Sequence, residues 1–140
     1  MTKTTNYQLN QWAKSDRIMM DDFNADNQKI DAALAEMPRI VTGTYTGTGT
    51  YGSGNPNTLT FDFAPKIIYV VLKQSYNSQA GMLILRGQTI CSSTGSPGGA
   101  YFCSCSFSGN TVSWYCDDRT NGAYIQFNTN GQEYLYIALG

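Results

Sequence analysis

The chain has 140 residues, a net charge of −1 and no histidine, and charged side chains make up only 14% of it, against about 25% in a typical soluble domain. The near-neutral charge argues against a general electrostatic attraction to nucleic acid. The absence of histidine excludes Ser-His-Asp and Cys-His catalysis and any histidine metal ligand.

Charged residues concentrate at the N-terminal end. The first 39 residues carry eleven of the nineteen charged side chains, and the density falls after Pro38. We therefore expect two parts, residues 1–38 and residues 39–140. No apolar run reaches the roughly 18 residues that cross a membrane, and no apolar leader opens the chain, so we expect neither membrane insertion nor a signal peptide.

Residues 1–38 predict an extended segment followed by a helix. Ser15 or Asp16 offers a first helix start signal, and Asp21 and Asp22 lie near a possible second start. Residues 21–37 are rich in helix-favouring side chains, and Pro38 ends the helix. The helix carries one narrow apolar stripe of four residues: Phe23, Ile30, Leu34 and Met37.

A lone helix of this length is marginally stable in water, so its stripe needs a partner. Two interpretations stay open. The helix packs on its own β domain, or it forms a short parallel bundle with copies of itself. The spacing of seven between three stripe residues favours the bundle.

From residue 40 onward, short β-rich runs alternate with Gly, Asn, Ser and Pro clusters. The predicted strands are residues 40–46, 58–63, 66–73, 82–86, 101–107, 111–116, 123–127 and 133–139. The fold class is therefore mainly β, with an N-terminal stem helix followed by an antiparallel β-sandwich or a closed Greek-key arrangement. Residues 67–72 are apolar on both faces, which predicts a central strand whose second face a neighbouring subunit covers.

One hairpin can be placed in register. Gly109-Asn110 is a two-residue turn, and closing it pairs residues whose numbers add up to 219. Cys105 then lies opposite Trp114, and these side chains share a face directed at the core.

Four cysteines, Cys91, Cys103, Cys105 and Cys116, follow the helix. Buried free thiols are the favoured interpretation. A Cys103–Cys116 disulfide and a structural zinc site are weaker alternatives, because Cys-x-Cys is not the usual zinc-ligand spacing.

Catalytic groups are scarce. The β part contains only four acidic residues, Asp62, Asp117, Asp118 and Glu133, and nothing in the sequence pairs two of them as a glycosidase requires. We expect that the protein is not an enzyme and that it binds neither a cofactor nor a metal. The adjacent Asp117 and Asp118 leave two interpretations open, a ligand for calcium or a sugar hydroxyl and a solvated turn. The glycine-rich residues 43–54 predict a long flexible hairpin tip and not a phosphate loop.

Two segments carry a family resemblance. NYQLNQW at residues 6–12 and DFNADNQKIDAAL at residues 22–34 resemble the start of tail-fibre and receptor-binding proteins of phages and prophages of Gram-positive bacteria. GTYTG at residues 43–47 and LTFDFAPKIIYV at residues 59–70 resemble the β domain often attached to those stems. The latter pattern is also similar to H-type lectins, small sandwiches that trimerise and bind sugars.

The resemblance implies a phage tail-fibre tip that recognises a host cell-surface saccharide without catalysis. It implies a homotrimer that docks on other phage tail proteins, located in the virion tail after synthesis in the bacterial cytoplasm. A purely structural tail or baseplate piece and a polysaccharide depolymerase are the alternatives.

Recognition is expected in loops 74–80, 92–100 and 117–122, because the strands are committed to packing. Their low charge favours a neutral saccharide. Aromatic rings there stack on sugars and polar side chains bind hydroxyls, although the tyrosines instead suit cross-strand or interface packing. The candidate ligand-binding residues are Tyr76, Asn77, Tyr115, Asp117, Asp118, Arg119, Asn121 and Tyr124, with Tyr51 and Tyr101 as further aromatics.

Overall fold

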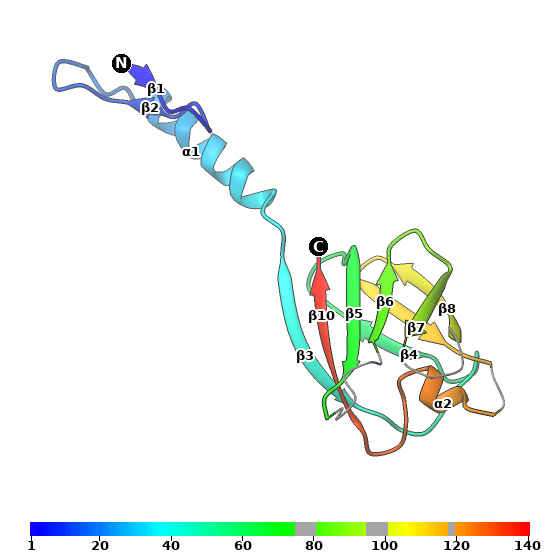
Figure 1. The fold of residues 1–140 in the computed structure, drawn as a ribbon. Coiled ribbons are helices and arrows are strands. Elements are labelled where there is room, and N and C mark those ends of the chain that lie inside the picture. Colours follow the sequence, from blue (N-terminus) through cyan, green and yellow to red (C-terminus); the bar gives the residue numbers. More distant parts are fainter. Residues whose placement is uncertain (75–80, 95–100, 118–119) are drawn as a thin grey trace. The chain divides into compact units, whose positions relative to one another are not determined.

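The computed structural model describes residues 1–74, 81–94, 101–117 and 120–140. The chain divides into two compact units, Met1–Pro38 and Arg39–Gly140 (Figure 1). Each unit has its own secondary structure and its own internal contacts, so each is described by itself.

The first unit is a small hairpin beside a helix. Strand β1 (Thr2–Lys3) pairs antiparallel with β2 (Asn10–Gln11), and helix α1 spans Met20–Ala35. The helix begins one residue before the predicted range and ends two residues short of it. Pro38 accounts for the early end, because a proline disfavours helical geometry in the residue before it.

The start signal predicted at Ser15 or Asp16 is wrong. The Asp16 carboxylate accepts a hydrogen bond from the Ala13 amide at 2.9 Å and pairs with the N-terminal ammonium at 3.1 Å. These two contacts lower the pKa of Asp16 below its usual value, the Ala13 amide contributing most. Asp16 therefore closes a turn ahead of the helix, and α1 begins without a side-chain cap.

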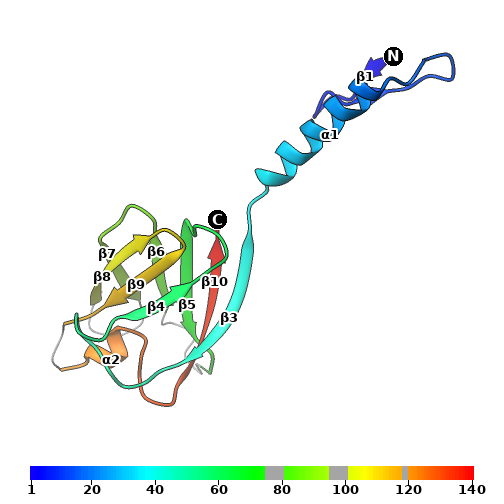
Figure 2. The same cartoon turned by 180° about the vertical axis from the view of Figure 1, so that it is seen from behind.

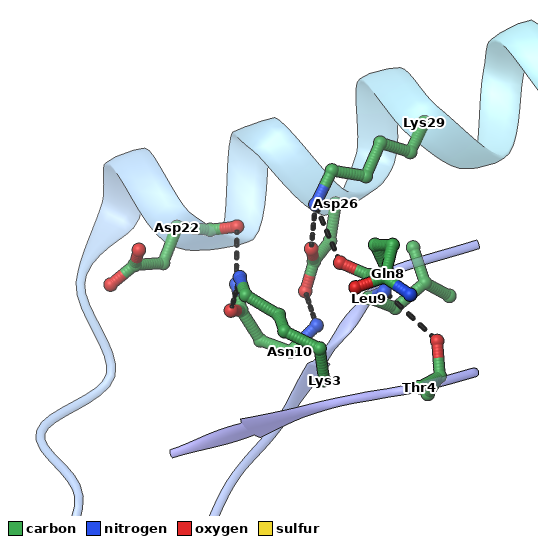
Figure 3. Close-up of polar contacts among 8 residues, drawn as sticks. All are labelled: Lys3, Thr4, Gln8, Leu9, Asn10, Asp22, Asp26 and Lys29. Atoms are coloured by element: carbon green, nitrogen blue, oxygen red, sulfur yellow. Dashed lines mark hydrogen bonds and ion pairs between the residues drawn. The ribbon is translucent and has the colours of Figure 1, made fainter. Parts of the chain in front are cut away.

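Polar contacts dock the hairpin against α1 (Figure 3). The Asp26 carboxylate accepts from the Asn10 backbone amide at 2.8 Å, and Lys29 donates to the Gln8 carbonyl at 2.7 Å. Lys29 also lies 3.5 Å from Asp26, and the Asn10 side chain donates to the Asp22 carbonyl at 3.2 Å. One flank of α1 is thereby tied to the segment that precedes it.

The apolar stripe of α1 lies beside that flank and is exposed to solvent in the single chain. Its members are between 42% and 60% exposed, and no residue of α1 is buried. They are Phe23, Ile30, Leu34 and Met37.

The second unit is built on one antiparallel sheet of eight strands in the order β3-β10-β5-β6-β7-β8-β9-β4. The sheet curls so that its two halves face each other across the core (Figures 1 and 2). This confirms a mainly β fold, with both layers formed by one curled sheet. The strands are β3 (Ile40–Thr46), β4 (Asn57–Thr60), β5 (Ile67–Leu72), β6 (Gly81–Leu85), β7 (Ile90–Thr94), β8 (Tyr101–Ser108), β9 (Thr111–Tyr115) and β10 (Glu133–Leu139).

The predicted strand at residues 123–127 is wrong, because Gly122–Ile125 form a short helix, α2. Ile125 and Phe127 are buried as an alternating pattern requires, but Gln126 between them is buried as well. A strand would turn Gln126 to the opposite face from its neighbours. Strand β7, which was not predicted, completes the eight strands and lies between β6 and β8.

Residues 43–54 are not the tip of a hairpin. Residues 43–46 belong to β3, which pairs with β10, whereas β4 pairs with β9 at the other end of the sheet. The Tyr136 side chain lies close to Gly43 within β3, and a side chain at this position would begin 2.3 Å from the Tyr136 hydroxyl oxygen. The chain leaves β3 and reaches β4 through a long connection, residues 47–56, which we call the β3–β4 connection (Figure 2).

The predicted register of the β8–β9 hairpin is confirmed. Cys105 lies opposite Trp114, and both side chains are buried in the core. On its other side β8 pairs with β7, which places Cys103 opposite Cys91. All four cysteines are free and buried.

Strand β5 occupies the central place that its composition predicts, between β10 and β6. Its inward residues Ile68 and Val70 are fully buried, whereas Ile67 and Tyr69 on the outer face are 37% and 42% exposed. On the outer face of this half, Leu83 of β6 lies opposite Tyr69 and Leu135 of β10 is also exposed. In the single chain, this outer face is apolar and largely uncovered.

Candidate functional site

The candidate ligand-binding residues fall into two groups. Four of them, Tyr76, Asn77, Asp118 and Arg119, lie outside the described residues, as do loop 75–80 and residues 95–100. The other four, Tyr115, Asp117, Asn121 and Tyr124, lie at the end of β9 and around α2. Tyr101 is partly buried and packs against the core. This agrees with the alternative interpretation, in which the tyrosines serve in packing.

Asp117 and α2 both contact the β3–β4 connection. The Asp117 carboxylate accepts a hydrogen bond from the Ser53 amide at 2.9 Å. The Tyr51 ring packs on Gly122, where any side chain would begin 2.1 Å from a ring carbon. Tyr51 and Tyr124 stay 38% and 50% exposed. Two segments that the sequence presents as separate candidates therefore form one polar, aromatic surface.

Gln126 holds this surface together from beneath. Its side chain is fully buried, and its carbonyl oxygen accepts from the backbone amides of Gly52 and Cys116, each at 3.0 Å. Its amide nitrogen donates to the Asn55 carbonyl at 2.8 Å and to the Asn57 side chain at 3.1 Å. One side chain thus fixes the β3–β4 connection to the end of β9.

The backbone around Gln126 is tied in the same way. The Trp114 indole donates to the Gln126 carbonyl at 2.8 Å, and the Tyr45 hydroxyl donates to the Phe127 carbonyl at 2.7 Å. Burial, and then the neighbouring Tyr134, raises the pKa of Tyr45 far above its usual value, so this phenol stays protonated and can donate. These buried polar groups are paired, as a low-dielectric core requires.

Asn128 fixes the first half of the connection. It is 5% exposed, and its carbonyl oxygen accepts from the Thr48 amide at 3.0 Å. Its amide nitrogen donates to the Thr48 hydroxyl at 2.9 Å and to the Thr50 carbonyl at 2.8 Å. The Asn128 backbone carbonyl accepts from Gly49 at 2.7 Å. The flexible tip expected at these residues is instead a closely bonded loop.

The backbone at the end of α2 directs the side chains of Gln126 and Asn128 toward the interior. The backbone amide of Asn128 donates to the Ala123 carbonyl, and the backbone amide of Phe127 donates to the Tyr124 carbonyl. This is the hydrogen-bond pattern of a Schellman helix end. Phe127 occupies the left-handed position at φ 60°, which costs about 1–2 kcal/mol for a residue other than glycine. The Phe127 ring is buried, and its centroid lies 5.7 Å from that of the Tyr134 ring. This packing compensates for the strain.

Sequence reasoning did not identify Gln126 and Asn128. Gln126 lies inside the predicted strand at residues 123–127 and Asn128 lies just beyond it, and each stands beside an apolar residue, so nothing in this stretch marks either amide as buried. The only local signal is Gly122-Ala123 ahead of the run, which leaves room for a tight turn. Their buried role depends on the β3–β4 connection, which is some 70 residues away in the chain.

The site shows little charge. Among the described residues, no three potential metal ligands lie together, and of the residues that the structure describes at this end of β9, Asp117 is the acidic one. No helix in the described ranges has the length and apolar character needed to span a membrane. The surface thus offers hydroxyl, amide and aromatic groups as its binding chemistry.

Comparisons with protein-family models, with curated proteins and with solved structures find no match to this chain.

Proposed function

We propose that this protein is the receptor-binding module of a phage tail fibre, which recognises a saccharide on the host cell surface and does not catalyse a reaction. The observation that carries the proposal is the surface formed by the β3–β4 connection, Asp117 and α2. Buried Gln126 and Asn128 hold it in place, and it presents polar and aromatic groups with little charge. Loops fixed on a rigid scaffold are where binding residues concentrate. The sequence resemblance of residues 6–34 supplies the phage context.

We further propose a parallel homotrimer. The α1 stripe and the outer face around Tyr69 and Leu83 are both apolar and exposed in the single chain. Exposed apolar surface of this extent favours association. Three copies would multiply weak saccharide contacts by avidity. In this proposal, residues 1–38 also provide the end that docks on other tail proteins.

The acidic residues support binding without catalysis. Asp117 accepts from Ser53, Glu133 pairs with Lys73 at 2.7 Å, and Asp62 pairs with Arg39 at 3.4 Å. Each of these three described carboxylates has its own hydrogen-bond or ion-pair partner. A glycosidase instead needs two carboxyl groups about 5–9.5 Å apart around the bond to be cut.

Adsorption of the purified full-length protein to host cell walls tests the proposal. We expect the wild type to adsorb and Tyr124→Ala to adsorb about tenfold more weakly, because an exposed ring that stacks on a sugar is lost. Tyr7→Ala removes an equally exposed tyrosine from the first unit and should adsorb like the wild type. Absence of adsorption by the wild type would contradict the proposal and favour a purely structural tail protein. Release of soluble sugar from the cell walls would favour a depolymerase.

A further inference from the structure

A groove of about 350 Å³ opens where the curled sheet ends. Its two edges are β3 and β4, which pair with β10 and β9 and not with each other. The β3–β4 connection forms the wall between them. Ligand pockets usually enclose about 300–1,000 Å³, so this space is large enough for one small unit of a ligand.

The lining of the groove is chemically uniform. Hydroxyl and amide side chains dominate it, and no charged side chain is among the residues that line it. Tyr45 is partly buried and supplies the aromatic part, and the fully buried Trp114 ring packs against it with ring centroids 6.2 Å apart. The polar members are Thr46, Thr48, Thr50, Asn55, Asn57, Thr58 and Asn128. Such a lining matches an uncharged, hydroxyl-rich ligand and offers nothing to balance a phosphate or a carboxylate.

Hydrogen bonding inside the wall determines what the groove offers. The Thr48 hydroxyl accepts from Asn128 at 2.9 Å and lies 2.8 Å from the Thr50 hydroxyl. If Thr48 donates its one hydroxyl proton to Thr50, the Thr50 hydroxyl proton is left to donate outward. Asn55 also lines the groove, and its side chain is exposed. With this bonding, the groove offers a ligand the Thr50 hydroxyl as a donor and the exposed Asn55 side chain as a second hydrogen-bonding group.

The wall is also preorganised. Gln126 fixes the Asn55 backbone, and Asn128 fixes Thr48 and Thr50. Binding would therefore order few additional groups, which reduces its entropic cost.

We propose that this groove is a subsite for one uncharged hexose or N-acetylhexosamine unit of the receptor saccharide. This inference rests on the proposed function and assigns a specific site and ligand class to it. The site differs from the α2 surface around Tyr124, although both border the β3–β4 connection.

The two tryptophans provide a direct test. Full-length protein labelled with 5-fluorotryptophan gives one ¹⁹F signal from Trp114, whose buried ring borders the groove and packs on Tyr45, and one from Trp12 in the first unit. Galactose, glucose, N-acetylglucosamine and N-acetylgalactosamine are titrated as probes, with glucuronic acid as the charged comparison. We expect at least one neutral sugar to shift the Trp114 signal while Trp12 stays unchanged, and glucuronic acid to have no effect. If a neutral sugar shifts both signals, or if no neutral sugar shifts either signal, the groove is not a saccharide subsite.

Matched variants complete the test. Thr50→Val keeps the shape and removes the outward donor, so the neutral sugar should bind about three- to tenfold more weakly. Thr60→Val removes a hydroxyl on β4 that bonds Thr111 at 3.1 Å and does not line the groove, so binding should not change. Asn55→Trp fills the rim and should abolish the shift, whereas Ser53→Trp alters the same loop outside the groove and should retain it.

Cell-wall adsorption distinguishes a failure of the groove inference from a failure of the proposed function. If the wild type and Asn55→Trp adsorb equally, the groove inference is wrong and the receptor-binding proposal stands. If the wild type does not adsorb and no sugar shifts its Trp114 signal, both the proposed function and the groove inference are wrong.

Discussion

Gln126 and Asn128 illustrate how single buried amides give a loop a defined shape. Residues 47–56 contain four glycines and would be mobile if they depended on their own side chains. The two amides bond the loop backbone from both ends and replace the water it would otherwise bind. A binding surface on this loop therefore depends on buried residues that give the loop its shape.

Gln126→Ala should lower the free energy of unfolding by about 2–4 kcal/mol, because the Gly52 and Cys116 amides lose their acceptor inside the protein. Urea denaturation followed by circular dichroism measures the change. Gln132→Ala is the matched control, since that side chain is exposed and its removal should change the stability by less than about 0.5 kcal/mol. Equal effects of the two variants would contradict the role given to Gln126.

The buried thiols predict a loss of stability in alkaline solution. Burial, with a further contribution from Cys91, raises the pKa of Cys105 from 9.0 to about 12. Hydrogen bonding with Cys103, together with burial, raises the pKa of Cys91 as well. Between pH 9 and 12 the unfolded chain loses protons that the folded chain keeps. The stabilising contribution is therefore complete below pH 9 and is lost as the pH rises toward 12.

Urea unfolding at pH 7, 9, 10 and 11 checks this expectation. Cys105→Ala removes one titrating group, so its stability should fall less steeply above pH 9 than that of the wild type. Ser106→Ala changes the exposed neighbouring residue, and its stability should follow the wild-type slope. A Cys105→Ala slope equal to that of the wild type would show that Cys105 does not titrate differently in the two states.

At the scale of elements, α1 has one flank occupied by the hairpin and one apolar stripe in solvent. Ile30→Glu places a charge in the stripe, so we expect the particle mass to fall from three times 15.4 kDa to that of one chain. Gln28→Glu adds the same charge at an exposed position outside the stripe and should leave the trimer intact. Light scattering on the full-length variants decides. A wild-type monomer at micromolar concentration would contradict the trimer.

The hairpin depends on Asp26 for its position on α1. Burial alone raises the pKa of Asp26, but the Asn10 amide and Lys29 outweigh it and the net pKa is lowered, so the docking contact persists until strongly acid pH. Asp26→Ala removes the acceptor, and the Asn10 amide should exchange its proton at least about threefold faster. Asp31→Ala, on the exposed side of the same helix, should not change that rate. Equal exchange in both variants would show that other contacts hold the hairpin.

The elements also show what the sequence could predict. β3 and β10 match their predicted ranges residue for residue, and the β8–β9 register follows from a single turn. Alternation of side chains and local turn signals determine such features, so they can be derived from short windows. β7 and α2 could not be found in that way. Ser92 and Ser93 make β7 resemble a loop, and the shape of α2 depends on partners far along the chain.

At the scale of the whole molecule, composition was enough to predict a helix followed by a mainly β unit. It was not enough to show that the two candidate loops merge or that a groove lies between β3 and β4. Both features follow from the order of strands in the sheet, which places the ends of β3 and β4 at opposite edges and brings their connection over β9. Sheet order depends on long-range pairing, which no local pattern specifies.

A glycan array probed with the full-length protein tests most directly whether this chain binds a host surface saccharide. We predict binding to glycans that contain uncharged hexose or N-acetylhexosamine units, with a signal about a hundredfold weaker for the monomeric Ile30→Glu variant because avidity is lost. A folded, trimeric wild-type protein that binds no bacterial surface glycan on the array would contradict the account.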